Sequence, residues 1–141
     1  MLCRIDSLSP VLSSAFILFH TRVFFDCIFI VALHFYCMDE LTDEERLEFI
    51  SLIHKLRSEQ RKRLGIDKVY YFYNEDTTHH FHLWMVPRYE WMYQFGNSVE
   101  SLRPALLHAR NNMNDDENMK SVEEGVSMLR EGMRDFVSSS R

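Results

Sequence analysis

The strongest constraint on the fold is a pair of short apolar segments that a polar turn separates. Residues 69–73 (VYYFY) are β-branched and aromatic, as in a strand, and residues 79–86 (HHFHLWMV) form a second segment of this kind. Residues 74–78 (NEDTT) between them are typical turn formers. The sequence therefore predicts an antiparallel β-hairpin.

The second strand of this hairpin has two different faces, because successive side chains on a strand point in opposite directions. One face is apolar, is expected to join the core, and consists of Phe81, Leu83 and Met85. The other face carries His80, His82 and Trp84. Two imidazoles therefore lie side by side with an indole next along, away from the expected core.

A long helix is expected before the hairpin. Thr42 and Glu45 have the spacing of a capping box, and Gly65 is a typical C-terminal cap. The apolar residues between these ends are expected to share one helix face, namely Leu47, Ile50, Ile53, Leu56 and Leu64.

Two more helices are expected after the hairpin. The first lies near residues 104–111, with Pro104 in its first turn. The second begins near Asp115 or Asp116 and carries an apolar stripe at helical spacing, made of Met119, Val122, Val126, Leu129, Met133 and Val137. Residues 138–141 are expected to form a disordered tail.

The N-terminal part of the chain has weaker patterns. Residues 15–20 (AFILFH) suit a short strand and residues 23–33 suit a buried one, but no pattern assigns a role to residues 1–22 as a unit. We therefore expect one α+β domain over residues 23–137, in which helices pack on a small antiparallel sheet.

The apolar run over residues 11–36 is long enough to cross a membrane, but Arg22 and Asp26 interrupt it. Each of these charges near the centre of a membrane helix costs about 2.5–3.5 kcal/mol. Only Arg4 precedes the run, and no small-residue cleavage motif closes it, so a signal peptide fits poorly. A buried strand is the favoured interpretation, and no membrane association is expected.

The net charge of the chain indicates which partners it can bind, and its cysteines indicate its cellular compartment. The formal net charge of -5 argues against a partner of extended nucleic acid, because phosphate affinity comes mainly from Lys and Arg. A small nucleotide needs only a local pocket. Cys3, Cys27 and Cys37 have no zinc-binding spacing and indicate free thiols in a reducing compartment, so a cytoplasmic location is expected.

The residues alone leave three explanations of the histidine pair open. The imidazoles can be structural and bond to backbone groups. They can chelate a transition metal, with His34, Glu75 or Asp76 as further ligands, although no third ligand has a fixed spacing. They can also act at phosphorus, because neutral imidazole is a competent nucleophile near pH 7.

The segment HFHLWMVPR (residues 80–88) resembles the signature of the histidine-triad (HIT) superfamily, in which histidines alternate with apolar residues and Pro-Arg often follows. An apolar strand, a histidine at position 34, a helix and a polar turn precede it in the family's order, so the resemblance spans roughly residues 23–95. It implies a HIT-like α+β fold, a homodimer, and a small-molecule nucleotide as ligand. We expect no cofactor and no metal at the site.

The resemblance also implies roles for individual residues. His82 would be the nucleophile that attacks the α-phosphate of a nucleotide and forms a covalent nucleotidyl-histidine, in a hydrolase or nucleotidyl transferase. His80 would orient His82, and His34 stands where the family often has a supporting histidine. Thr77 and Asn74 match positions that contact the phosphates.

Trp84 stands in the place of the third histidine, which in the family donates a hydrogen bond to phosphate. The indole N–H can still donate one bond, so Trp84 is also a candidate phosphate-binding residue. Loss of a preorganised donor commonly costs about 10²–10³ in rate. In addition, Asp76 replaces the family's Gln, and the turn lacks the Gly-rich stretch that wraps phosphates. The alternatives are therefore a catalytically degenerate HIT-like nucleotide-binding protein and, less favoured, a His-rich metal-binding protein.

Overall fold

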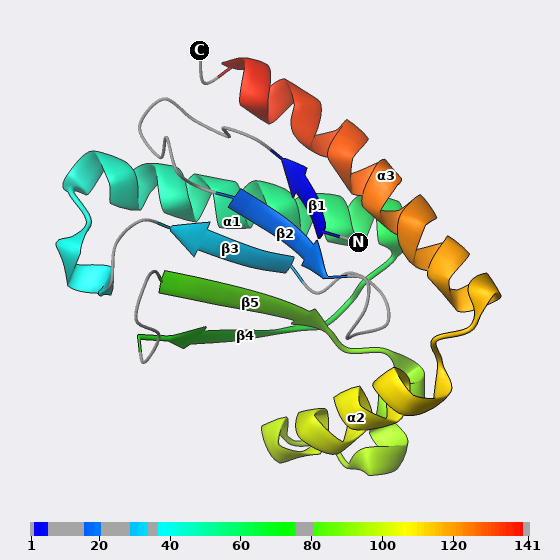
Figure 1. Ribbon diagram of the computed structural model, residues 1–141. Coiled ribbons are helices and arrows are strands. Elements are labelled where there is room, and N and C mark those ends of the chain that lie inside the picture. Colours follow the sequence, from blue (N-terminus) through cyan, green and yellow to red (C-terminus); the bar gives the residue numbers. More distant parts are fainter. Residues whose placement is uncertain (1, 6–15, 21–28, 34–36, 76–80, 140–141) are drawn as a thin grey trace.

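Five strands form one antiparallel sheet within the part of the chain that the structure describes, in the order β1-β2-β3-β5-β4 (Figure 1). The structure is a computed structural model, and it describes residues 2–5, 16–20, 29–33, 37–75 and 81–139. The strands are β1 (Leu2–Ile5), β2 (Phe16–His20), β3 (Phe29–Leu33), β4 (Val69–Asn74) and β5 (Phe81–Pro87). The expected α+β class is confirmed.

The predicted hairpin is confirmed by the pairing of β4 with β5. The two strands are antiparallel, and Phe72 pairs with Trp84 and Asn74 with His82. On its other side β5 pairs with β3, so β5 is an interior strand of the sheet. Residues 76–80 lie outside the described residues, and the predicted start of the second strand at His79 and His80 is among them.

The N-terminal strands extend the sheet beyond the expected domain boundary. β2 confirms the short strand expected at residues 15–20, and β3 confirms the C-terminal part of the strand expected at 23–33. β1 pairs with β2, and β2 pairs with β3. The two described pieces of residues 1–22 therefore belong to the sheet, a pairing that the sequence did not predict.

Local signals set both ends of α1 (Asp43–Leu64), as expected. The Glu45 backbone N–H donates to Thr42 Oγ at 3.3 Å, and the Thr42 N–H donates to Glu45 Oε2 at 2.8 Å. At the other end, Gly65 adopts the left-handed conformation with φ of 65° and donates its N–H to the Arg61 carbonyl.

The expected buried face of α1 is wrong in part. Leu56 is fully buried, but the side chains of Leu47 and Ile50 are 73% and 62% exposed. The helix has a second apolar stripe that includes Phe49 and Leu52, and this stripe packs against the sheet. Because Leu56 is close to both stripes on the helix surface, the apolar period alone did not distinguish them.

The C-terminal part of the chain is helical, as expected. It consists of the short 3₁₀ helices η2 (Glu90–Phe95) and η3 (Val99–Ser101), followed by α2 (Leu102–Asn112) and α3 (Asp116–Ser139). Four members of the predicted stripe on α3 are buried, namely Val122, Val126, Leu129 and Met133. α3 continues to Ser139, two residues into the expected tail. Within the described ranges, no helix is both long and apolar enough to cross a membrane.

The two faces of the β4–β5 hairpin pack against different partners. Phe81, Leu83 and Met85 lie in the main core with residues of α1 and α3, which confirms the predicted apolar face. In Figure 1, α1 runs behind the sheet and α2 lies beyond β4. On the opposite face, Val86 packs in a second cluster with Leu102 of α2 and with η2. The histidine-bearing face is therefore the one nearer to α2.

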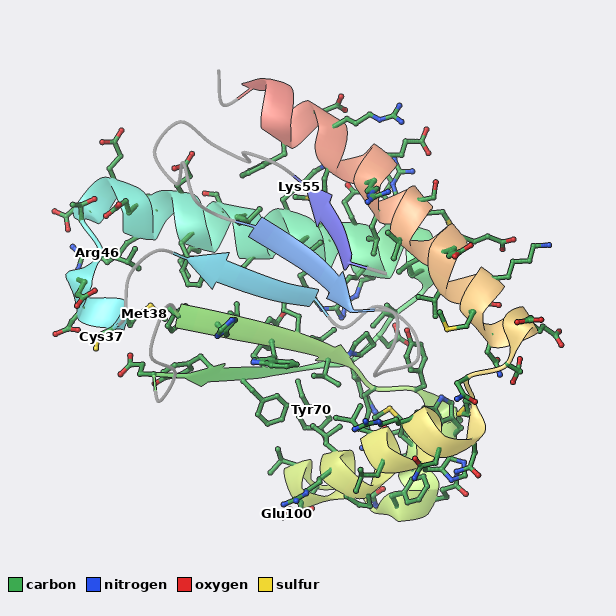
Figure 2. The ribbon with its side chains drawn as sticks, in the orientation of Figure 1. Cys37, Met38, Arg46, Lys55, Tyr70 and Glu100 are labelled. Carbon is green, nitrogen blue, oxygen red and sulfur yellow. The ribbon has the colours of Figure 1, made fainter. Side chains whose placement is uncertain are left out.

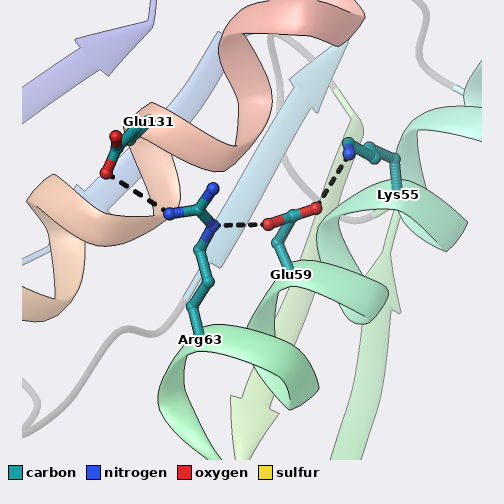
Figure 3. Close-up of polar contacts among 4 residues, drawn as sticks. All are labelled: Lys55, Glu59, Arg63 and Glu131. Atoms are coloured by element: carbon teal, nitrogen blue, oxygen red, sulfur yellow. Dashed lines mark hydrogen bonds and ion pairs between the residues drawn. The ribbon is translucent and has the colours of Figure 1, made fainter.

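An ion-pair network joins α1 to α3 (Figure 3). The Glu59 carboxylate is 6% exposed and accepts hydrogen bonds from Lys55 Nζ at 2.8 Å and from Arg63 Nε at 2.6 Å. Arg63 also contacts Glu131 of α3 at 3.3 Å. The hydrogen bonds from Lys55 and Arg63 hold the pKa of Glu59 below its usual range, although burial opposes them.

Candidate functional site

His82 lies in the interior of the sheet, on the face that the sequence predicted for it. Its Cα pairs with Ala32 of β3 on one side and with Asn74 of β4 on the other. Its side chain is half-buried, between the fully buried Phe81 and the buried Leu83 along β5. The rigid strands on both sides fix the backbone that presents this imidazole, which is what a positioned nucleophile requires.

The predicted site residues divide into two groups. The structure brings together His82, Trp84 and the backbone of Asn74, which stands directly opposite His82 in the register. The other three predicted residues, His34, Thr77 and His80, lie outside the described residues, as does the side chain of Asn74. Their roles remain predictions.

Trp84 is the next residue on the same face of β5. It pairs with Ile30 of β3 and with Phe72 of β4, and its side chain is half-buried. The indole lines a cavity of about 520 Å³ between the hairpin and α2. Trp84 is therefore an apolar wall of this cavity that also has one N–H donor.

The cavity has walls that sequence reasoning missed. Residues of α2 form the opposite wall of this open cavity, and they include Leu102, Leu106, Arg103 and Arg110. The sequence signal was the spacing of Arg103, Leu106, Leu107 and Arg110, since positions i, i+3, i+4 and i+7 share one helix face. Nothing local in the sequence indicated that this helix packs beside the histidine strand.

Arg88 of the Pro-Arg pair is a structural residue. It is buried, and its Nη1 donates to Ser101 Oγ at 2.9 Å while Nη2 donates to the Gly96 carbonyl. Its guanidinium lies 4.7 Å from the centre of the Tyr93 ring. Arg88 therefore fixes the loop of η2 and η3 to the end of β5, which in turn places α2.

The end of the sheet near the hairpin turn is acidic. The Met38 N–H donates to Glu75 Oε1 at 3.1 Å, and Figure 2 shows Cys37 and Met38 beside this end of the sheet. Burial and the nearby carboxylates of Glu75, Glu40 and Asp39 raise the pKa of the Cys37 thiol. The thiolate form that a metal ligand or a nucleophile needs is therefore disfavoured at this position.

The metal-binding alternative gains no support from the described residues. Among them, no three His, Cys, Asp or Glu side chains gather closely enough to hold a metal ion. His34 and Asp76, two of the proposed further ligands, lie outside the described residues.

A second hollow, of about 450 Å³, lies over α1 and is lined by His54, Arg57, Ser58, Arg61 and Lys62. Arg57 is already engaged, because it donates to the carbonyls of Ile66 at 2.9 Å and Asp67 at 2.7 Å. Arg61 also donates to Asp67. These cations stabilise the turn after α1, which explains their place in the sequence without a ligand.

Comparison with known proteins gave no match for this chain, neither among protein-family models nor among curated proteins or solved structures.

Proposed function

We propose that this chain is a HIT-like nucleotide hydrolase or nucleotidyl transferase with His82 as its nucleophile. The observation that carries the proposal is the position of His82 on an interior strand. The imidazole is half-buried on the sheet face opposite α1, and Asn74 is its register partner on β4. The resemblance of residues 80–88 to the HIT signature supplies the reaction class, and it also implies a homodimer.

In the proposed reaction, a lone pair on an imidazole nitrogen of His82 attacks the α-phosphorus of a nucleotide. A P–N bond forms, the bond from phosphorus to the leaving group breaks, and the leaving group keeps the electron pair. Water or another acceptor then displaces the imidazole from phosphorus. His80 and His34 are proposed to orient His82, while Asn74, Thr77 and Trp84 are proposed to contact the phosphates.

One observation favours a second candidate, a protein that binds nucleotides without turning them over. The side chain at the third histidine position, Trp84, forms a wall of the apolar cavity. The indole of Trp84 has one N–H donor. A histidine at this position would be smaller, and its ring N–H would lie in a different place. A site with fewer preorganised donors stabilises the transition state less.

The proposal is tested by AMP release from adenosine 5′-phosphoramidate and from dinucleoside polyphosphates. We expect turnover by the wild-type protein and only background rates for His82→Asn. The matched control is His54→Asn, which changes an exposed histidine on α1 and should leave the rate unchanged.

A third variant separates the two candidates. Trp84→His restores a triad pattern, and we expect it to raise the rate by up to about 10²–10³. If no variant turns over but calorimetry detects nucleotide binding that His82→Asn weakens, the binding protein is selected. Absence of both turnover and binding would contradict both candidates.

A further inference from the structure

The cavity between the hairpin and α2 has the size and composition of a small-molecule site. Its volume of about 520 Å³ is within the usual range for ligand pockets, about 300–1,000 Å³. Phe72 and Trp84, which pair across β4 and β5, form one wall, and Leu106 of α2 forms part of the opposite wall. The walls therefore favour an aromatic or branched apolar body.

Two arginines from α2 also line this cavity. Arg103 and Arg110 are seven positions apart and hence lie on one helix face, about 10 Å apart along the axis. Both are exposed, and no ion pair or hydrogen bond joins either of them to another described residue. No described acidic side chain lines the cavity. The cavity is therefore apolar and positively charged, with no internal counter-charge.

We propose that this cavity binds an amphipathic organic anion, with an aromatic or branched apolar body and one carboxylate. The body would pack against Phe72 and Trp84, where burial of apolar surface favours binding. The carboxylate would accept a two-point hydrogen bond from Arg103 or Arg110, a geometry that guanidinium groups favour. A neutral ligand would gain no such ion pair, and a cation would be repelled.

This inference goes beyond the proposed function and does not depend on it. The cavity includes Trp84 but not His82, and ligand binding there requires no nucleotide and no chemistry. If the turnover experiments fail, the anion site in the cavity is unaffected. If the dye experiments fail, the proposed nucleotide chemistry at His82 is unaffected.

The test uses the fluorescent aromatic anion 8-anilinonaphthalene-1-sulfonate, displaced by 1-naphthoate or by its neutral analogue 1-naphthalenemethanol. We expect one saturable site from which 1-naphthoate displaces the dye at least tenfold better than the alcohol. The double variant Arg103→Gln/Arg110→Gln should lose this preference, whereas the alcohol should compete equally well with both proteins. Circular dichroism confirms that the variant is folded.

A matched pair of exposed apolar residues provides the control. Leu107 lines the cavity and is 49% exposed, whereas Met128 on α3 is 40% exposed and lies outside it. Leu107→Glu should weaken dye binding at least tenfold through charge repulsion, and Met128→Glu should change it less than twofold. Equal effects of these two variants, or an unchanged naphthoate preference in the arginine variant, would overturn the proposal. Loss of dye binding as the protein self-associates would also overturn it, because a second copy would then cover the cavity.

Discussion

Gly132 shows how one absent methyl group allows the contact between α1 and α3. An added Cβ at this position would collide with the Glu59 carboxylate and would lie 2.6 Å from Arg63 Nε. Glycine within a helix costs about 1 kcal/mol relative to alanine. Its place in the C-terminal half of α3 is explained by the ion pair of Glu59 and Arg63 that it contacts (Figure 3).

We therefore predict that Gly132→Ala destabilises the protein. The added methyl group displaces the Glu59–Arg63 pair, and overpacking costs about 1–3 kcal/mol against a gain in helix propensity of about 1 kcal/mol, so we expect a net loss of up to about 2 kcal/mol. Urea unfolding of the two proteins measures the difference. The same substitution in a Glu59→Ala background is expected to be neutral or stabilising, because the side chain that it displaces is gone. A destabilisation of equal size in both backgrounds would contradict this explanation.

At the scale of the elements, the ends of α1 depend on local chemistry. The reciprocal bonds of Thr42 and Glu45 satisfy two backbone N–H groups that the first helical turn leaves without partners. Both side chains are close in sequence to the groups that they cap. This is why the helix start could be predicted from four residues.

We predict that Thr42→Ala lowers the free energy of unfolding by about 1 kcal/mol. Thr42→Ser keeps the hydroxyl acceptor and should lie within about 0.5 kcal/mol of the wild type. Thermal unfolding followed by circular dichroism measures both. If the serine variant is as unstable as the alanine variant, the loss comes from the methyl group and the capping explanation is wrong.

The elements also show which parts of the fold the sequence could and could not predict. The hairpin, the helix ends and the two faces of β5 follow from patterns within a few residues, and the structure confirms them. The pairing of β1 with β2 joins segments with weak patterns. The exposure of Leu47 was not predictable, because α1 has two apolar stripes and only tertiary packing selects one.

In the candidate site, too, some features follow from local sequence patterns and others depend on tertiary packing. Periodicity alone placed His82 and Trp84 on one face, and the register of β4 adds the backbone of Asn74. The cavity beside Trp84 depends on α2, whose position is fixed by the buried Arg88 and its bonds to Ser101 and Gly96. Such long-range contacts leave no local pattern in the sequence.

At the scale of the whole molecule, the Glu59 network connects the two long helices and makes stability depend on pH. The pKa of Glu59 is lower in the folded protein than in the unfolded chain. Glu59 therefore stabilises the fold above its unfolded pKa, about 4.3, and this contribution is lost as the pH falls through the folded pKa.

We predict that Glu59→Gln costs about 1.5–3 kcal/mol at pH 7, because it removes a charged partner of Lys55 and Arg63. The difference from the wild type should shrink as the pH falls below about 4.3. Glu131→Gln is the control, since its side chain is 63% exposed and the change should be below about 0.5 kcal/mol. A Glu59 effect that stays constant from pH 7 to pH 3 would contradict the assigned pKa shift.

The central claim, that His82 is a nucleophile toward phosphorus, is tested most directly by mass spectrometry after incubation with adenosine 5′-phosphoramidate. The protein is quenched without acid, which preserves P–N bonds, and is then digested. We expect one adenylyl group on the peptide that contains His82, none in His82→Asn, and an unchanged adduct in His54→Asn. An unmodified wild-type protein, or an adduct that persists in His82→Asn, would contradict the claim.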